Sequence, residues 1–296
     1  MKVTIVITTK NRKGDLENAL HSVLTQSVHP EVILIDDGST DGTSEMVAKN
    51  FPSVRLVSHE NSKGLVVRRN EGAKLATGEI IVSIDDDAAF STTEVIAQAL
   101  RSFDDDRIGA VAIPYREPHK ENCMLQTAPD TESVWMTSYF IGTAHALRRD
   151  LFLQLGGYRE ALVHQGEEND FAIRLLDAGY GVALAVTDEI LHFESPKRDY
   201  SRMDFFGARN QLLWVWTYSP RLLLPLQFLG TLIRTICFAR SLRRDHNQYS
   251  GISAAFREII KGWPRSPTSW STFRLFRRLR KKPLCLPELG RFLKQP

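Results

Sequence analysis

Cysteine is scarce in this sequence: the chain of 296 residues has three, Cys123, Cys237 and Cys285, and they are far apart. They form no CxxC pair, and their number and spacing exclude a disulfide framework and give no zinc-site pattern. Cysteine usage of this kind is typical of a reducing compartment. The chain has 43% hydrophobic residues, so we expect a hydrophobic core rather than cross-links to stabilise the fold.

The sequence also lacks a long uninterrupted apolar segment. The N-terminal residues contain no apolar signal-peptide core, and Val3–Thr9 has the pattern of a first β-strand. The most apolar later segment, Leu222–Ala239, is interrupted by Pro225, Gly230 and Arg234. A membrane-spanning helix needs about 20 predominantly apolar residues. We therefore expect a cytoplasmic protein without a transmembrane helix.

Acidic residues become rare toward the C-terminus. From Arg240 to Pro296 the chain has 14 Lys and Arg but three Asp and Glu, a net charge of +11, whereas residues 1–239 have a net charge of −8. A basic segment of this kind indicates an anionic surface as partner, either phospholipid or nucleic acid. Nucleic acid is disfavoured because the acidic remainder of the chain would repel a phosphate backbone.

Aromatic and aliphatic residues alternate with Arg and Lys in this basic segment, among them Trp263, Trp270 and Phe273. The pattern suits amphipathic helices that lie on an anionic membrane surface. It suits equally well helices that pack on the rest of the chain or form the contact of a homodimer. We therefore expect two parts: a main domain of residues 1–200 and a helical, basic C-terminal extension of residues 201–296.

Strands and helices alternate in the first hundred residues. Runs of β-branched and aliphatic residues predict strands, and apolar residues at helical spacing predict the helices between them. The predicted strands are Val3–Thr9, Val32–Ile35, Val54–Val57 and Ile80–Ile84, and the predicted helices span about 15–24, 41–51 and 66–76. This alternation predicts an α/β fold with a mostly parallel sheet and helices on both faces.

The pattern is less regular after Asp87, but it still predicts short elements. Residues 115–132 are expected to form a long binding loop or lid. The predicted strands are 108–114, 134–143, 182–186 and 190–193, and the predicted helices are 92–103, 148–155, 166–178 and 202–218.

Two of the predicted strands end in acidic residues. The strand at Ile80–Ile84 is followed at once by Asp85, Asp86 and Asp87, and the second strand is followed by the sequence DDGSTDG. In an extended segment residues two apart point the same way, so Asp85 and Asp87 can face one point. Two oxygen ligands on one side suit Mg²⁺ or Mn²⁺, and ligands of open α/β sheets bind at the carboxyl ends of strands. The alternative is a solvated acidic turn.

Several separated motifs have a characteristic order and spacing. They are Ile7–Arg12 (ITTKNR), Ile35–Gly42 (IDDGSTDG), Asn61–Asp87, Gly142–Thr143, Leu155–Tyr158 (LGGY) and Gly166–Arg174 (GEENDFAIR). Together they resemble the family 2 glycosyltransferases, inverting enzymes with the GT-A fold, over roughly residues 3–195, and bacterial rhamnosyltransferase-type members most of all. Thr8 stands where the family usually has a proline, and Arg159 where it often has an acid; neither change removes a catalytic group.

The resemblance implies a nucleotide-diphosphate sugar as donor. The residues that it places at the donor are Thr8, Thr9, Arg12, Asp36, Asp37, Arg69, Asn70, Asp85 and Asp86. Either Asp36 or Asp37, together with Thr8 and Thr9, would meet the pyrimidine base of the nucleotide, and the acid would accept a hydrogen bond from its N–H. Asp86 would approach the ribose or the sugar. The residues alone allow other roles, since DDGSTDG is also a favourable Asx-turn and helix-capping sequence. Arg69 and Asn70 equally suit a pair on a helix surface.

The resemblance also implies a divalent cation, Mg²⁺ or Mn²⁺, bound by Asp85 and by Asp87, the latter more directly. His192 would be a third ligand, as in some relatives. The ion would act as a Lewis acid that neutralises charge on the departing nucleoside diphosphate. A lone histidine more often has a structural hydrogen-bonding role, so both interpretations of His192 stay open.

Inversion by direct displacement needs a base that takes the proton of the acceptor hydroxyl. Glu167, Glu168 and Asp170 lie at a predicted helix start, where adjacent positions point about 100° apart, so we expect one of them to aim inward. By position in the resembled motif Glu168 is the expected base and Glu167 the second choice. Asp170 is placed to pair with Arg174. The alternative is that all three simply occupy a helix N-terminus.

These residues together predict a metal-dependent inverting glycosyltransferase. It would move a sugar from a UDP or dTDP donor to a hydroxyl of a cell-surface glycan or lipid-linked acceptor, with Gly142, Thr143 and Asp170 at the acceptor. The expected place of action is the inner face of the cell membrane, to which the basic extension would attach the protein peripherally.

Two other functions are compatible with the same residues. A sugar nucleotidyltransferase would need a Gly-rich phosphate loop with Lys or Arg directly after the first strand, and Thr8–Gly14 matches that pattern poorly. A non-catalytic subunit that binds nucleotide sugar or membrane would keep the acids but show no turnover.

Overall fold

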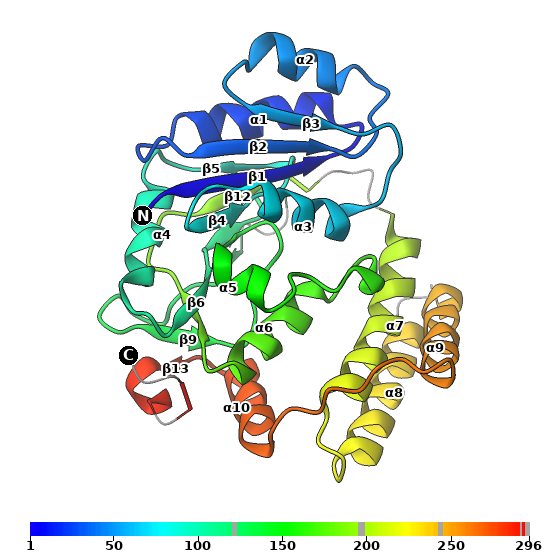
Figure 1. Ribbon diagram of the computed structural model, residues 1–296. Helices are drawn as coiled ribbons and strands as arrows, with labels where there is room; N and C mark the ends of the chain where they lie inside the picture. Colours follow the sequence, from blue (N-terminus) through cyan, green and yellow to red (C-terminus); the bar gives the residue numbers. More distant parts are fainter. Residues whose placement is uncertain (120–122, 195–198, 242–244, 291, 294–296) are drawn as a thin grey trace.

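The computed structural model of this protein describes residues 1–119, 123–194, 199–241, 245–290 and 292–293, and it has a mixed α/β architecture (Figure 1). The strands are β1 (Val3–Thr9), β2 (Glu31–Asp36), β3 (Arg55–Ser58), β4 (Ile80–Ser83), β5 (Ala88–Phe90), β6 (Ile108–Ala112), β7 (Tyr115–Arg116), β8 (Met124–Leu125), β9 (Trp135–Thr137), β10 (His145–Arg148), β11 (Gly181–Leu184), β12 (Ile190–His192) and β13 (Leu284–Cys285). The α-helices are α1 (Lys13–Leu24), α2 (Thr43–Asn50), α3 (Leu65–Leu75), α4 (Val95–Leu100), α5 (Arg149–Gln154), α6 (Glu167–Asp177), α7 (Tyr200–Tyr218), α8 (Leu224–Ser241), α9 (Asp245–Ile260) and α10 (Trp270–Lys281).

A nine-stranded sheet in the order β13-β9-β11-β6-β10-β4-β1-β2-β3 forms the centre of the molecule. Among the described strands of this sheet, β9 and β10 run against the others, so the predicted mostly parallel sheet is confirmed. Because crossovers between parallel strands are right-handed, α1 and α2 cover one face and α3 the other. Coverage on both faces explains why β1 and β4 are buried along their whole length.

The register of the parallel strands brings their carboxyl ends to one edge. Thr9, the last residue of β1, pairs with Asp36, the last residue of β2, and Val6 of β1 pairs with Ser83 at the end of β4. The acidic segments after β2 and β4 therefore leave the sheet on the same side. This edge is where open α/β sheets bind their ligands.

The predicted single strand at 134–143 is wrong. The chain forms β9, leaves the sheet, and returns as β10, which inserts antiparallel between β4 and β6. The buried side chain of Gln126, which follows β8, bonds the segment between β9 and β10. Its Nε2 donates to the carbonyls of Ile113 and Ala144, and its Oε1 accepts from the Ile141 N–H at 2.7 Å. The insertion places Gly142 and Thr143, just before β10, beside the end of β4.

The expected long loop at 115–132 contains two short strands in its described part. These strands, β7 and β8, belong to a four-stranded sheet in the order β5-β12-β7-β8. Strand β12 pairs antiparallel with β5, with His192 opposite Ala88, and the Phe193 N–H donates to the Asp87 carbonyl at 2.8 Å. This pairing holds His192 next to the acidic segment that follows β4.

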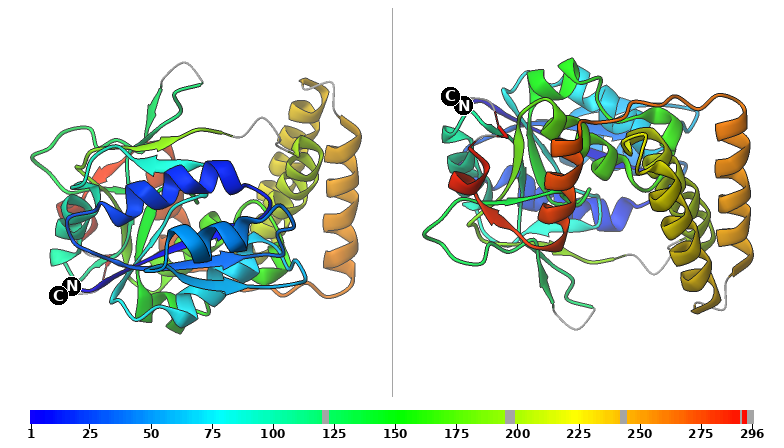
Figure 2. Two further views of the ribbon diagram at one scale, coloured as in Figure 1. Left: turned by 90° about the horizontal axis from the view of Figure 1, so that it is seen from above. Right: turned by 90° about the horizontal axis from the view of Figure 1, so that it is seen from below.

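Helices α7, α8 and α9 form a group at one side of the sheet (Figure 2). They have a small core of their own, made by Ala208, Leu212, Leu213, Ile252 and Ala255. Among the described residues, none of the helices combines the length and the apolar character that crossing a lipid bilayer requires.

Helix α10 lies apart from this group and packs on the main domain. Its apolar side chains Phe273, Phe276 and Leu279 are buried in the large core, and the Phe276 ring lies 5.3 Å from the Trp214 ring of α7. The strand that follows, β13, joins the nine-stranded sheet beside β9. Of the two roles expected for the basic segment, packing on the rest of the chain therefore holds for α10. Residues on both sides of the expected boundary at 200 share one core.

Close packing of α3 on β1 gives a first testable prediction. A Cβ added at Gly72 would lie 2.3 Å from Cγ1 of Val6, a stiff β-branched side chain inside the core. Gly72→Ala should therefore lower the free energy of unfolding, measured by urea denaturation, by about 1–3 kcal/mol.

Gly207 in the middle of α7 provides a matched control. An added Cβ there meets nothing within 4 Å, so Gly207→Ala should raise the stability by about 0.5–1 kcal/mol through helix propensity. Equal effects of the two substitutions would contradict the packing described.

Candidate active site

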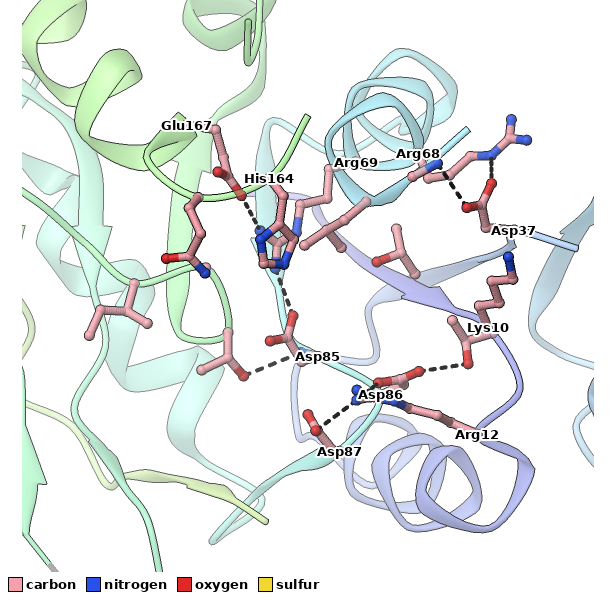
Figure 3. Close-up of a pocket in the computed structure, with 18 of the residues that line it drawn as sticks. Lys10, Arg12, Asp37, Arg68, Arg69, Asp85, Asp86, Asp87, His164 and Glu167 are labelled. Carbon is pink, nitrogen blue, oxygen red and sulfur yellow. Dashed lines mark hydrogen bonds and ion pairs between the residues drawn. The ribbon is translucent and has the colours of Figure 1, made fainter. Parts of the chain in front are cut away.

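A cavity of about 590 Å³ opens at the carboxyl edge of β1, β2 and β4 (Figure 3). Its walls come from the loops after these strands, the segment before β10, the starts of α6 and α7, and β12. Of the residues expected at the site, those that line the cavity are Thr8, Thr9, Arg12, Asp37, Arg69, Asp85, Asp86, Asp87, Gly142, Thr143, Glu167, Glu168 and His192. Asp36, Asn70 and Asp170 are not in its lining.

Asp37 is held by four hydrogen bonds from one loop and one helix. Its Oδ1 accepts from the Lys63 N–H at 2.8 Å and from Arg68 Nε at 2.6 Å. Its Oδ2 accepts from the Ser62 hydroxyl at 2.5 Å and from the Gly64 N–H at 2.9 Å. Burial alone would raise the pKa of Asp37, but these donors outweigh it and lower the pKa from 3.8 to about 2. With both oxygens fully used, Asp37 fixes the loop at 61–64 in the cavity wall.

Asp36 stabilises a turn instead. Its Oδ1 accepts from the Ser39 N–H at 2.9 Å, and its Oδ2 accepts from the Ser44 hydroxyl in α2. Asp41 in the same turn accepts from the Thr43 N–H at the start of α2. The Asx-turn interpretation of DDGSTDG is therefore confirmed at Asp41, which bonds the N–H two residues on, while Asp36 bonds the N–H three residues on.

Arg12 neutralises two of the three acids that follow β4. Its Nη1 lies 2.9 Å from Asp86 Oδ1 and 2.7 Å from Asp87 Oδ2. Asp86 also accepts from the Thr9 hydroxyl at 2.7 Å. Burial raises the pKa of Asp86 to about 7, although Arg12 and Thr9 act in the opposite direction. The acidic run is thus a buried, bonded cluster and not a solvated turn.

Asp85, Asp87 and His192 converge on one point, with one ligand atom of each within 4.8 Å of the others. His192 Nε2 lies 3.3 Å from Asp87 Oδ1, and Nδ1 lies 3.3 Å from Glu117 Oε1. Burial lowers the pKa of His192, but the bond to Asp87 and the neighbouring carboxylate charges outweigh it and raise the pKa overall. Two carboxylates and an imidazole fit a divalent ion such as Mn²⁺ or Mg²⁺.

Arg69 is a buried cation between two walls of the cavity. It is 5% exposed, and its Nη2 lies 2.6 Å from Asp85 Oδ1. Its Nη1 lies 3.7 Å from Glu167 Oε1 and 3.9 Å from Glu168 Oε1. A Cβ at position 142 would lie 2.7 Å from this Nη1, so Gly142 leaves the space that the guanidinium needs. Arg69 is not part of a helix surface pair.

Glu167 and Glu168 both face the cavity, so the expectation that one acid aims inward is wrong. The reason is that Arg69 approaches both carboxylates and compensates their charges. Burial raises the pKa of each, and the charge of Glu167 raises that of Glu168 further, while Arg69 opposes both shifts. The Glu167 side chain is 3% exposed and that of Glu168 is 19% exposed. Glu168 is therefore the more accessible of the two.

Asn70 and Asp170 have structural partners outside the cavity. The Asn70 amide exchanges two hydrogen bonds of 2.8 Å with the backbone of Tyr158. Asp170 pairs with Arg174 at 2.8 Å, as predicted, and also accepts from the Tyr218 hydroxyl at 2.6 Å. Both residues support the loops around the site.

Sequence reasoning missed several residues of the cavity wall. These are Lys10, Ser62, Gly64, Leu65, Arg68, Tyr115, Glu117, Ile141, His164, Gln165, Asp199, Arg202 and Met203. A signal was present for some of them: Lys10, Ser62, Gly64, Leu65 and Arg68 lie inside the motifs that resemble the family, and His164 and Gln165 stand just before Gly166 and the acid pair. No comparable signal marks the start of α7, where Arg202 reaches across toward Gly64.

Comparison with known proteins identifies the family of this chain. The profile of Glycosyl transferase family 2 matches residues 4–158, and the chain belongs to this family of glycosyltransferases. It is similar to the O-antigen chain rhamnosyltransferase RfbN of Salmonella typhimurium, with 25% identity over 222 residues, 68% of this chain and 70% of RfbN. It is also similar to the uncharacterized glycosyltransferase YwdF of Bacillus subtilis, with 28% identity over 225 residues, 72% of this chain and 82% of YwdF.

Solved structures share the fold. The mannosyltransferase PcManGT from Pyrobaculum calidifontis, in complex with GDP-Man and Mn²⁺, matches with a TM-score of 0.62 and 22% identity, covering 94% of this chain and 79% of that one. S. aureus TarS 1-349, in complex with UDP-GlcNAc, matches with a TM-score of 0.64 and 16% identity, covering 89% and 84%. The GT-A fold expected from the sequence is thereby confirmed.

The hydrogen bonds of Asp37 give a second testable prediction. Asp37→Asn should lower the free energy of unfolding at pH 7 by about 2 kcal/mol, because a buried carboxylate loses charge-assisted bonds. The folded-state pKa is lowered, so the stabilising effect is complete above the ordinary pKa of 3.8 and is lost as pH falls toward about 2. The deficit of the variant should shrink over that range in urea denaturation.

Asp15→Asn serves as control, since Asp15 is exposed in the first turn of α1. Its effect should stay within about 0.5 kcal/mol. A deficit of Asp37→Asn that is as large at pH 3 as at pH 7 would contradict the assignment.

Proposed function

We propose that this glycosyltransferase is a metal-dependent, inverting enzyme that moves a sugar from a nucleotide-diphosphate donor to a hydroxyl of a cell-surface glycan or lipid-linked acceptor. The observation that carries the proposal is one cavity with a metal-ligand group, Asp85, Asp87 and His192, on one wall and an acid pair on another. The names of relatives support it: RfbN is an O-antigen chain rhamnosyltransferase, and PcManGT binds GDP-Man and Mn²⁺.

The nucleotide would lie against the loops after β1 and β2. Thr8 and Lys10 line this end of the cavity together with the 61–64 loop that Asp37 fixes. Both oxygens of Asp37 already accept hydrogen bonds within the protein. We therefore assign the contacts with the nucleotide's base to other groups of this loop. Lys10, after β1, and Arg202, in the first turn of α7, both bring cations to the cavity, and cations suit a diphosphate.

Asp85, Asp87 and His192 would hold the divalent ion, with its remaining positions open to water and donor phosphate. Bound there, the ion would stabilise the negative charge of the departing nucleoside diphosphate. Glu117 bonds the second ring nitrogen of His192 and fixes the ring orientation. Carboxylates suit Mg²⁺ and Mn²⁺ alike, but imidazole is a better ligand for a transition metal, so we favour Mn²⁺.

Glu168 is our candidate for the general base. It is more exposed than Glu167 and lies beside Gly142 and Thr143, where an acceptor hydroxyl would enter. Burial makes its carboxylate more basic than an exposed one, while Arg69 favours the ionised form that can take a proton. Glu167, held more deeply against Arg69, would orient the guanidinium.

Two substitutions test the two walls separately. Wild-type protein should be stabilised against heat by one nucleotide sugar from a panel of UDP-, dTDP- and GDP-linked donors, and more strongly with Mn²⁺ than without it. Asp87→Ala should abolish the Mn²⁺-dependent part of this stabilisation. Glu168→Gln should keep donor binding but lower sugar transfer by about 10²–10⁴-fold, because it removes the base alone.

Glu45→Gln, an exposed change on α2, should leave binding and transfer unchanged. Normal transfer by Glu168→Gln would overturn the role of Glu168. Absence of stabilisation by any donor above millimolar concentration, with Mn²⁺ present, would favour a subunit without catalytic function.

We further propose that the protein docks on an anionic lipid bilayer through α8, which would bring it to a lipid-linked acceptor. Leu222, Leu226, Leu229 and Ile233 are 52–92% exposed. They are three or four residues apart, so they form one continuous apolar stripe at and after the start of this helix. Exposed apolar stripes of this kind mark interaction surfaces.

Basic side chains beside this stripe favour an anionic partner. Arg221 and Arg234 are exposed on and next to α8. Burial and the neighbouring charges of Arg234 and Arg277 lower the pKa of Arg280, so cations of α8 and α10 gather in one place. A membrane of anionic lipids offers both an apolar interior for the leucines and phosphates for the arginines.

Vesicle binding tests this surface. Wild-type protein should co-sediment with phosphatidylglycerol vesicles and less with phosphatidylcholine vesicles. The double change Leu226→Gln and Leu229→Gln should weaken binding by about tenfold or more, since it removes two apolar side chains from the lipid contact.

Val186→Gln, an exposed apolar residue elsewhere, serves as control. Absence of binding to anionic vesicles would overturn the proposal. A concentration-dependent dimer that the double change abolishes would assign the stripe to a second copy of the chain instead.

A further inference from the structure

The loop that precedes α6 has an unusual backbone. Val163 and Gln165 both have φ of 66°, and Gly166 has φ of 92°. Residues other than glycine rarely adopt this left-handed region, because their Cβ comes too close to the backbone carbonyl oxygen. The loop places His164 and Gln165 in the cavity wall and leads directly into Glu167 and Glu168. A strained segment at this position needs a partner that holds it.

Asn210, in the middle of α7, provides that partner. Its Nδ2 lies within hydrogen-bonding distance of three carbonyls of the loop and shares its two hydrogens among them: Leu162 at 3.0 Å, His164 at 2.9 Å and Gln165 at 2.7 Å. The side chain is 3% exposed, so water does not compete for these bonds.

Arg209 fixes the orientation of this amide. Its Nη1 donates to Asn210 Oδ1 at 2.8 Å, which leaves the NH₂ group facing the loop carbonyls. The same Nη1 lies 3.2 Å from the Ala161 carbonyl, so the pair binds the whole segment from 161 to 165. One turn further along α7, the Trp214 Nε1 donates to the Asn169 carbonyl at 3.2 Å.

We propose that Asn210 is a positioning residue for sugar transfer: it holds the loop at 162–166 and thereby aims Glu167 and Glu168 into the cavity. The inference rests on the proposed function for its catalytic part, and on the hydrogen bonds alone for its structural part. It assigns the start of the C-terminal extension a role in turnover, although Asn210 does not line the cavity itself.

The chemistry of the site requires an amide. Three carbonyl oxygens converge on one NH₂ group, and an aspartate of nearly the same size would face them with oxygen instead of hydrogen. Asn210→Asp therefore changes the polarity and keeps the packing. Asn210→Ala removes the side chain and leaves space for water, which can replace part of the bonding.

The closing experiment measures loop order and turnover on the same variants. Hydrogen–deuterium exchange of the peptide that covers residues 161–168 needs no ligand, and it should become faster in both Asn210 variants. Turnover is then measured with the donor that stabilises wild-type protein, as the nucleoside diphosphate released when the sugar is transferred to water. We expect kcat to fall by up to about a hundredfold with the donor KM unchanged, because the nucleotide end of the cavity is untouched.

Gln211→Ala is the matched control, since Gln211 is the next residue of α7 and is exposed. It should match wild type in both measurements. Unchanged exchange at 161–168 in folded Asn210→Asp and Asn210→Ala would overturn the structural part. Faster exchange with unchanged kcat would overturn the catalytic part. A higher donor KM together with a lower kcat would overturn it too, and would assign Asn210 a general folding role. If wild type releases no nucleotide from any donor, the proposed function fails, and exchange still decides whether Asn210 holds the loop.

Discussion

A single buried guanidinium, that of Arg69, connects two walls of the candidate active site. A buried charge without a partner costs several kcal/mol, so the protein must bring carboxylates to it. Asp85 comes from the end of β4, and Glu167 and Glu168 come from the start of α6. These acids would repel one another without the cation between them. Gly142 completes the arrangement because a larger residue would occupy the same space. The candidate metal ligands and the candidate base are thus connected by one side chain.

Much of the first half of the fold is predictable from the sequence, because strand and helix periodicities there agree with the final structure. The strands that precede Asp37 and Asp85 were predicted together with the edge at which they meet. Strand β10 was not, since its four residues have no distinct periodicity and depend on pairing with two distant strands. The contribution of Asn210 could not be predicted either, because its partners lie about fifty residues earlier in the chain. Local patterns do not encode such contacts.

The two amphipathic helices of the extension illustrate the same limit. In α10, Phe273 and Phe276 are buried in the main core, whereas in α8, Leu226 and Leu229 remain exposed. Their sequences alone allow either outcome, because an apolar stripe indicates a contact surface but does not identify what covers it.

The fold also does not decide the chemistry, since one architecture supports many reactions. The family assignment and the arrangement of acids in the cavity carry the functional conclusion.

The position of β13 has a consequence for the order of folding. This strand lies at the outer edge of the central sheet and pairs with β9, a partner nearly 150 positions earlier in the chain. During synthesis this edge of β9 therefore remains open until Leu284 and Cys285 have been made, and open edges are sites of aggregation. Because the bonds of Asn210 to the loop before α6 also need α7, the growing chain cannot complete the candidate site before α7 has folded.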